Sequence, residues 1–354
     1  MSAPDPAQAA ERVKALGLAV GFDLAGIAPA EPTRETEFLR EWLARGYAGE
    51  MLWIGGRVEE RVDPRRVLPG ARSVVALGLV YDPGAPHDPE RGRLRVARYA
   101  GGADYHDVLL DRVRAFEAGL PPLLGRPVRT RGYVDTGPVL ERAFAARAGL
   151  GWIGKNSCVI HPRLGSYLFL AVVVTDAELA EDEPEPDHCG SCRACLDACP
   201  TGAFPEPYVL DATRCISYTT IESRGAVPEP LRAAHGDWVF GCDVCQEVCP
   251  WNLRERRRVP PDVHGLRARI APREPWVAPT LAWLLALDEE SWRAATRRTA
   301  LRRARYRGLL RNALVAAGNS GDASLVPLVR RHAQGDDPLL AEHARWALDR
   351  LGDS

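Results

Sequence analysis

The sequence predicts three structural parts: an α/β domain in residues 1–180, a small cysteine-rich domain in residues 181–255, and an all-α part in residues 256–354. Three observations lead to this prediction. Apolar, β-rich segments alternate with helical patterns in the first part, most of the cysteines lie between positions 189 and 249, and helical patterns fill the last part. A chain of 354 residues is long enough for two or three domains.

The first part is expected to alternate strands with helices. Residues 73–80 (SVVALGLV) and 166–176 (SYLFLAVVVTD) are apolar and rich in β-branched residues, which is typical of central strands. Residues 10–30 predict a helix that stops at Gly21 and is followed by a strand. Residues 105–120 carry apolar side chains at helical spacing. Together these patterns predict the α/β class.

Charge and hydropathy indicate a soluble protein. The formal net charge is -1, so any contact with nucleic acid must come from a local patch. The longest apolar run, residues 167–174, is far shorter than the ~20 residues that cross a bilayer. The first residues show neither a signal-peptide pattern nor a twin-arginine signal. We therefore expect a cytoplasmic protein, in which clustered thiols indicate metal binding or catalysis before disulfides.

The cysteines form two sets after an acidic, proline-broken linker at residues 181–187. The first set has the spacing C-x2-C-x2-C-x3-C-P and consists of Cys189, Cys192, Cys195 and Cys199. The second set has the same ending but a displaced first member, and consists of Cys215, Cys242, Cys245 and Cys249. This spacing is that of bacterial two-cluster ferredoxins, in which the fourth cysteine of a run ligates the other [4Fe–4S] cluster. The second part is therefore predicted to be ferredoxin-like.

Crossed ligation gives each cluster four thiolates. The first cluster would be bound by Cys189, Cys192, Cys195 and Cys249, and the second by Cys199, Cys215, Cys242 and Cys245. Structural zinc is the alternative, but zinc sites usually consist of two C-x2–4-C pairs, which this spacing fits poorly. Cys158 is left over and is expected to be a small buried apolar residue. Such clusters carry electrons and need a partner group for bond chemistry.

A basic, proline-rich connector at residues 251–275 leads from the cysteine-rich domain into the last part. Further on, RNALVAAGNSG (residues 311–321) and ARWALDRLGD (residues 344–353) share an Ala-Leu pair that is followed by glycine. The pairs begin at positions 313 and 347, a period of 34 residues. This repeat predicts two stacked helical units of HEAT type.

Residues 291–311 hold eight arginines and no acidic residue. One interpretation is a solvated helix face. The other is a contact with RNA or another polyanion, because arginine pairs well with phosphate and Trp292 and Tyr306 could stack on bases. Arg303 and Arg307 are four residues apart and are expected to share one face of a helix.

Several motifs connect the chain to one enzyme family. Residues 131–170 contain VDTGPVLER and GLGWIGKN, residues 188–203 and 242–252 contain the cluster motifs, and residues 214–222 are RCISYTTIE. The cluster motifs occur in many proteins, but their combination with Asp135 and GWIGKN is specific. On these residues the chain resembles the epoxyqueuosine reductases over almost its full length, a family related to the reductive dehalogenases.

The resemblance implies an oxidoreductase that uses cobalamin and two [4Fe–4S] clusters. It would reduce the epoxide of epoxyqueuosine, at the wobble position of tRNA, to the cyclopentene of queuosine. Cobalamin would lie between the α/β domain and the nearer cluster, the helical repeats would help to hold the tRNA, and an electron donor that the sequence does not identify would supply the clusters. The implied proton donor is Asp135. Because a free aspartate has a pKa of ~3.9, we expect burial or a neighbouring negative charge to raise it.

The same resemblance implies a set of cofactor-binding positions. They are Arg57, Tyr99, Asp135, Lys155, Asn156, Ser157, His161 and Ser217. For each, ordinary packing or hydrogen bonding is the alternative. The string DVHG at residues 262–265 departs from D-x-H-x-x-G, whose histidine binds cobalt in many cobalamin proteins. Cobalamin would therefore be held without an axial histidine.

Two other functions compete with this hypothesis. A reductive dehalogenase-like enzyme would use the same cofactors, but those enzymes are commonly exported and lack an arginine-rich helical tail. The other is a non-enzymatic iron–sulfur protein that carries electrons and binds RNA. That function would not account for the α/β domain or for Asp135.

Overall fold

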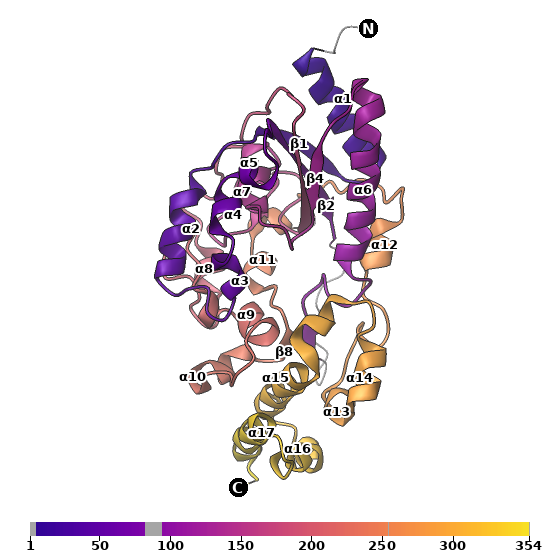
Figure 1. The fold of residues 1–354 in the computed structure, drawn as a ribbon. Coiled ribbons are helices and arrows are strands. Elements are labelled where there is room, and N and C mark those ends of the chain that lie inside the picture. Colours follow the sequence, from indigo (N-terminus) through magenta and orange to yellow (C-terminus); the bar gives the residue numbers. More distant parts are fainter. Residues whose placement is uncertain (1–4, 82–93, 254, 354) are drawn as a thin grey trace.

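A four-stranded sheet forms the centre of the first domain (Figure 1). The computed structural model describes residues 5–81, 94–253 and 255–353. The strand order is β1-β2-β7-β4, with β1 (Leu24–Pro29), β2 (Ser73–Val80), β7 (Leu168–Thr175) and β4 (Thr130–Tyr133). The strands predicted at 73–80 and 166–176 are confirmed as the central pair. Each pairing in this sheet is antiparallel, so it is not the parallel sheet usual in α/β domains.

Helices cover both faces of the sheet. They are α1 (Pro6–Ala19) and α6 (Tyr105–Leu124) on one face, and α7 (Glu141–Arg147) on the other. Successive residues of β2 point to opposite faces, so Val75 and Leu77 pack with α1 and α6, whereas Val74 and Ala76 pack with α7. The predicted stop at Gly21 is confirmed, since α1 ends just before this glycine and its φ of +114° suits few other residues.

Short helices link β1 to β2 on the α7 side of the sheet (Figure 1). They are α2 (Glu35–Ala44), α3 (Leu52–Gly55), α4 (Val58–Val62) and α5 (Pro64–Val67). Two large apolar side chains of this segment, Leu52 and Trp53, are 80% and 45% exposed. The segment therefore leaves apolar surface uncovered.

The cysteine-rich part consists of short elements joined by loops. They are α8 (Ala194–Asp197), η1 (Ala212–Arg214), α9 (Ile216–Ile221), α10 (Glu229–Arg232), η2 (Ala233–His235), β8 (Trp238–Phe240), α11 (Val244–Glu247) and η3 (Pro250–Asn252). A small hairpin of β5 (Trp152–Ile153) and β6 (Val159–Ile160) lies before it in the chain. Strand β8 pairs with β3 (Arg95–Val96), so the first two parts share a second small sheet.

The rest of the chain is helical. It contains α12 (Leu266–Ile270), α13 (Leu281–Ala286), α14 (Glu289–Ala295), η4 (Ala300–Ala304), α15 (Arg305–Ser320), η5 (Ala323–Leu325), α16 (Val326–Ala333) and α17 (Pro338–Leu351). The two repeat strings lie in α15 and α17, which pack on each other, but their glycines have different roles. Gly318 lies inside α15 against Trp346, whereas Gly352 ends α17 with a left-handed φ of +80°. In the described ranges, no helix combines the length and apolar composition that a membrane span requires.

Hydrophobic cores cross the predicted domain boundaries. The connector runs back along the first domain, where Leu266 and Ile270 of α12 join the core beneath α1 and α6 (Figure 1). Another core combines Val96 of β3 and Phe240 of β8 with α13 to α17. The three parts therefore pack as one continuous body.

The predicted arginine face is wrong. Arg305 has a left-handed φ of +61° and separates η4 from α15, so Arg303 and Arg307 do not lie along one helix. Each also has an acidic partner from elsewhere in the chain: Arg303 binds Glu222 and Arg307 binds Asp337. Compensating acids are therefore present in space although they are absent from the stretch itself.

Candidate functional site

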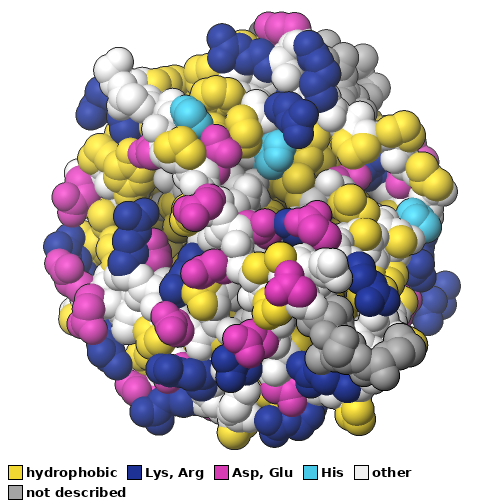
Figure 2. Space-filling view, turned by 90° about the horizontal axis from the view of Figure 1, so that it is seen from above, with side chains coloured by type: hydrophobic (Ala, Val, Ile, Leu, Met, Phe, Trp, Pro, Cys, Tyr) yellow, Lys and Arg dark blue, Asp and Glu magenta, His cyan; other side chains and the backbone are white. Residues whose placement is uncertain are grey.

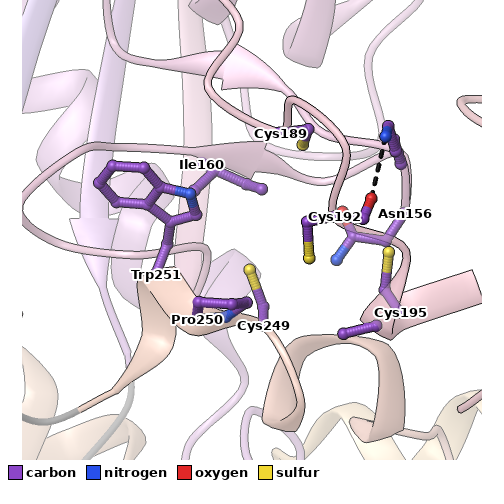
Figure 3. A pocket seen from close by; sticks show the side chains of 10 residues that line it. Asn156, Ile160, Cys189, Cys192, Cys195, Cys249, Pro250 and Trp251 are labelled. Carbon is purple, nitrogen blue, oxygen red and sulfur yellow. Dashed lines mark hydrogen bonds between the residues drawn. The ribbon is translucent and has the colours of Figure 1, made fainter.

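Four thiols line one pocket between the hairpin and the cysteine-rich loops (Figure 3). They belong to Cys189, Cys192, Cys195 and Cys249. Ile160, Pro250 and Trp251 supply apolar walls, and the indole of Trp152 donates a hydrogen bond to the Cys189 sulfur at 3.4 Å. Two sulfurs come from the loop that leads into α8, the third comes from Cys195 within α8, and the fourth comes from the segment between α11 and η3. This pocket brings together sulfurs that crossed ligation assigns to one cluster.

The thiols of the second predicted group are also neighbours. Burial raises the pKa of Cys242, and the charges of Cys215 and Cys199 raise it further. Burial likewise raises the pKa of Cys215, again with a contribution from Cys199. The charges of Cys215 and Cys242 contribute to the raised pKa of Cys245. Thiols that resist ionisation in this way become good ligands once a positive iron centre compensates the charge.

All nine cysteines are free thiols. Within the described residues, no three His, Cys, Asp or Glu side chains come together as closely as one metal ion requires. A structural zinc ion needs four sulfurs at ~2.3 Å from a single point. The four thiols that line one pocket match the number of thiolates that one [4Fe–4S] cluster takes.

Cys158 contacts a predicted cluster ligand, which the sequence did not lead us to expect. It lies beside Cys245, and a hydrogen bond between the two thiols lowers the pKa of Cys158 and raises that of Cys245. Its backbone N–H donates to Asn156 Oδ1 at 3.2 Å. The expectation of an inert apolar residue is therefore incomplete, because the side chain touches a predicted ligand.

Several predicted cofactor-binding residues support the cysteine loops. The Lys155 ammonium donates to the carbonyl oxygens of Gly190 and Cys192, and the Asn156 amide donates to that of Cys245. These contacts tie the turn between β5 and β6 to both cysteine sets.

Ser157, Ser217 and His161 also make local contacts. The hydroxyl of Ser157 donates to the Tyr208 carbonyl, and that of Ser217 hydrogen-bonds to the Cys215 sulfur. Nδ1 of His161 accepts from two backbone N–H groups of the following turn. Burial lowers the pKa of His161 to about 4, so its ring is neutral at pH 7. These three positions organise loops.

Asp135 lies in an exposed loop directly after β4, and its side chain is 62% exposed. Its Oδ2 accepts a hydrogen bond from the Tyr105 hydroxyl at 3.1 Å and is 3.2 Å from His106 Nε2. The left-handed φ of +58° is tolerated by aspartate and directs the residue away from the strand. The carboxyl is thus accessible to a large substrate and held by two partners from the start of α6.

The expected rise in the pKa of Asp135 is wrong for this arrangement. Although the side chain is largely exposed, the protein around its carboxyl partly removes water and opposes ionisation. The hydrogen bond and charge of His106 outweigh this effect and hold the pKa of Asp135 below its ordinary value. Burial also lowers the pKa of His106, yet the hydrogen bonds and charges of Asp104 and Asp135 outweigh it and raise the value to about 9. At neutral pH the pair therefore consists of an imidazolium and a carboxylate.

Glu141 is the second carboxyl of this site. Its Oε1 accepts the backbone N–H of Asp135 at 2.7 Å, which fixes the loop. Burial, with a contribution from the charge of Asp135, raises the pKa of Glu141 to about 8. Of the two carboxyls, Glu141 on α7 therefore holds a proton at neutral pH, whereas Asp135 does not.

The segment around α3 and α4 fits a bulky, partly apolar cofactor. The exposed Leu52 and Trp53 offer apolar surface, and the buried Nε of Arg61 has no partner among the described residues. Arg57 pairs with Glu60 at 3.1 Å, and the half-buried Tyr99 packs edge-on against Tyr105 behind Asp135. A macrocycle with amide side chains, such as cobalamin, would cover the apolar surface and could satisfy the unpartnered donor.

His106, Tyr105 and Glu141 also belong to the site, although the sequence alone did not predict them. For His106 a local sequence signal was present, because Asp104 and His106 lie two residues apart at the start of a helix. The contact of His106 with Asp135 joins two distant parts of the chain and has no local pattern. The ion pair of Arg303 with Glu222 was missed for the same reason.

Two protein-family models match parts of the chain. Residues 188–252 match the model described as "4Fe-4S double cluster binding domain". Residues 61–136 match the model described as "Epoxyqueuosine reductase QueG, DUF1730". The second match ends just after Asp135. Together the two matches include the eight predicted cluster cysteines and Asp135.

Curated relatives extend over almost the whole chain. The epoxyqueuosine reductase of Pseudomonas aeruginosa is 40% identical over 362 residues, which cover 100% of this chain and 98% of the relative. That of Gloeobacter violaceus is 43% identical over 324 residues, covering 90% and 98%.

Solved structures of epoxyqueuosine reductases are also similar to this chain over almost its whole length. A crystal structure of epoxyqueuosine reductase with a tRNA-Tyr epoxyqueuosine-modified tRNA stem loop has a TM-score of 0.88 at 32% identity, covering 98% of this chain and 91% of that chain. A Bacillus subtilis epoxyqueuosine reductase, with a catalytic loop swung out of the active site, has a TM-score of 0.86 at 32% identity.

The double-cluster domain beside an exposed, hydrogen-bonded carboxyl defines the class of protein as an iron–sulfur oxidoreductase. Full-length identity of about 40% to a curated relative then determines the family. The chain belongs to the epoxyqueuosine reductases.

Proposed function

We propose that the protein reduces the epoxide of epoxyqueuosine in the wobble position of tRNA to the alkene of queuosine. The observation that carries this proposal is Asp135, which is exposed beside His106 and follows the segment that matches the epoxyqueuosine reductase family. The reaction consumes two electrons and two protons and releases the oxygen as water. The chain must therefore supply an electron path and a proton path to one place.

Cobalamin, when bound, would supply the electrons at the substrate. We propose that it lies against the α3–α4 segment, where Arg61, Leu52 and Trp53 fit such a group, with Asp135 on its open side. The two clusters would be ligated by the crossed sets, with Cys249 completing the pocket of the first set and Cys199 completing the second. An electron donor that remains to be identified would reduce the clusters. We also propose a cytoplasmic location, where thiols stay reduced.

Asp135 would act as the proton donor to the epoxide oxygen. An alkoxide is too basic to leave unaided, so a positioned acid must protonate it as the C–O bond breaks. The carboxyl is exposed to substrate and fixed by Glu141 through its own backbone. The proton must reach Asp135 from a neighbour, because Asp135 itself is ionised at neutral pH.

Incubating the reduced, cobalamin-loaded protein with tRNA that carries epoxyqueuosine tests the proposed function. Nucleoside mass spectrometry should detect queuosine, which is lighter than the substrate by one oxygen atom. A halogenated phenol, offered under the same conditions, should remain intact. Dehalogenation of the phenol without conversion of the tRNA would instead support the dehalogenase alternative.

We propose that exposed arginines between α14 and the first residue of α15 contact the tRNA. Arg297, Arg298, Arg302 and Arg305 are exposed, and within the described ranges none is paired with a carboxylate. Arg311, in contrast, is fully buried and donates to backbone carbonyls, so it is structural. Figure 2 shows that basic and acidic side chains are interspersed on the face at the opposite, sheet end of the molecule, which offers no comparable surface of one charge.

Arg297→Glu combined with Arg302→Glu should weaken tRNA binding at least ~10-fold and flatten its salt dependence, because fewer counterions are released from phosphate. Both residues have ordinary backbone angles, so the change does not disturb the left-handed Arg298 and Arg305. Affinity is measured at several salt concentrations. The matched control, Arg114→Glu with Arg126→Glu, makes the same charge change on exposed positions of the first domain. Identical binding curves for the two double variants would show that the tRNA is held elsewhere.

A further inference from the structure

We infer that His106 stores the proton that Asp135 delivers to the substrate, and that Asp104 holds His106 in the orientation for this transfer. This inference rests on the proposed epoxide reduction and adds a positioning residue to it. It follows from a continuous chain of three side chains that ends at the exposed carboxyl.

The chain begins at the cap of α6. Asp104 Oδ1 is 2.7 Å from His106 Nδ1 and also accepts the backbone N–H of His106 at 3.1 Å. On the other side of the ring, Nε2 is 3.2 Å from Asp135 Oδ2. One carboxylate thus fixes the ring orientation, while the other lies at the opposite nitrogen. This is the arrangement in which an imidazole can hold a proton for one partner while the other stabilises its charge.

Aromatic packing keeps the imidazole in this plane. The ring stacks on Tyr105 with centroids 4.0 Å apart, and Tyr105 stacks in turn on Phe169 of β7 at 4.3 Å. The backbone N–H of Asp104 donates to the Arg298 carbonyl at 2.8 Å, which connects the start of α6 to the loop of exposed arginines. The His106 side chain remains 32% exposed, so solvent can return a proton to it.

The stoichiometry of the reaction requires such a store. The first proton converts the epoxide oxygen to a hydroxyl as one C–O bond breaks, and the second converts the hydroxyl to water as the other C–O bond breaks. Two electrons from the reduced cofactors complete the balance and leave the alkene. One oxygen therefore receives both protons, but a carboxyl carries one at a time. Transfer from His106 Nε2 to Asp135 Oδ2 would load the carboxyl for each step.

The charged surroundings favour a proton on His106. The titratable and charged groups that face the His106–Asp135 pair are Asp104 at the N-cap of α6, Tyr105 on α6, Tyr99 after β3, Glu141 and Arg142 on α7, Arg61 on α4, and Arg303 on η4. Of these, Asp104 contacts the imidazole directly and is negative. Arginines contribute positive charge on the Asp135 side, which keeps that carboxylate ionised until the imidazolium transfers its proton.

The first test detects the proton on His106 and needs no cobalamin. In the cobalamin-free protein with its clusters in place, NMR of labelled histidine should show His106 titrating near pH 9. Asp135→Asn and Asp104→Asn should each lower that midpoint, because each removes a negative charge beside the ring. His264→Gln, a change of an exposed histidine in the connector, should leave it unaltered. A His106 midpoint at its ordinary value, insensitive to both Asn variants, would overturn the inference.

The second test measures single-turnover queuosine formation against pH in wild type and His106→Gln. An acid must be protonated to act, so the wild-type rate should persist through neutral pH and fall as pH rises through about 9. In His106→Gln, Asp135 lacks its store, so the fall should occur at lower pH and the rate at neutral pH should drop ~10²-fold. Equal profiles would contradict the relay. Absence of queuosine with wild type would instead refute the proposed function, and the NMR titration would still decide the relay.

Discussion

Asp135→Asn is expected to bind cobalamin and tRNA normally while forming queuosine ~10²–10⁴-fold more slowly than wild type, the usual contribution of a general acid. The amide has nearly the shape of the carboxyl, and asparagine also tolerates the left-handed φ of +58°. It retains hydrogen-bonding capacity toward Tyr105 and His106 but cannot pass on a proton. The variant therefore separates chemistry from binding.

This result is measured as single-turnover product formation, together with tRNA affinity and the visible spectrum of bound cobalamin. Thr136→Val, in the same exposed loop, is a suitable control because the Thr136 hydroxyl bonds only to the nearby Val134 carbonyl among the described residues. Near-normal queuosine formation by Asp135→Asn at neutral pH would remove Asp135 from the mechanism.

Cys249→Ser is expected to lose one cluster, so that iron content falls from about eight to about four per chain. Cys249 lies with Cys189, Cys192 and Cys195 in one pocket, although it belongs to the other sequence run (Figure 3). Queuosine formation should stop, because electrons could no longer pass along both clusters. The measurement is iron and sulfide content after anaerobic reconstitution, with the spectrum of the remaining cluster.

Cys158→Ser is the matched control for this loss. Its thiol touches Cys245 but completes neither set of four, so iron and sulfide should stay at wild-type levels. Loss of a whole cluster in Cys158→Ser, or full iron content in Cys249→Ser, would contradict the ligand assignment.

Local patterns were enough to predict the central strands. Residues 73–80 are buried along their whole length, so an unbroken apolar run was a sufficient signal. The antiparallel order could not be predicted, because pairing of β2 with β7 joins distant segments. The connector is similar: its composition indicates a linker, whereas Leu266 and Ile270 complete the core of the first domain.

The candidate site likewise combines features that local sequence predicts with features that it does not predict. Cysteine spacing is a local property, and it predicts which thiols line the pocket in Figure 3. The pKa values and ion pairs of the site, in contrast, depend on residues that are far apart in the sequence. The low pKa of Asp135 depends on His106, and the pairing of Arg303 depends on Glu222, neither of which is near in sequence. A motif could therefore indicate Asp135 as the acid but not the location of its proton.

We expect electrons from the two clusters to drive reduction of the tRNA epoxide. Counting electrons tests it most directly. The cobalamin-loaded protein is reduced, freed of excess reductant, and mixed anaerobically with tRNA that carries epoxyqueuosine. Cluster oxidation is followed by absorbance and queuosine by mass spectrometry. One queuosine should form for every two electrons withdrawn from the reduced cofactors, and none should form when cobalamin is omitted. Queuosine formed without cluster oxidation, or clusters oxidised while the epoxide stays intact, would contradict it.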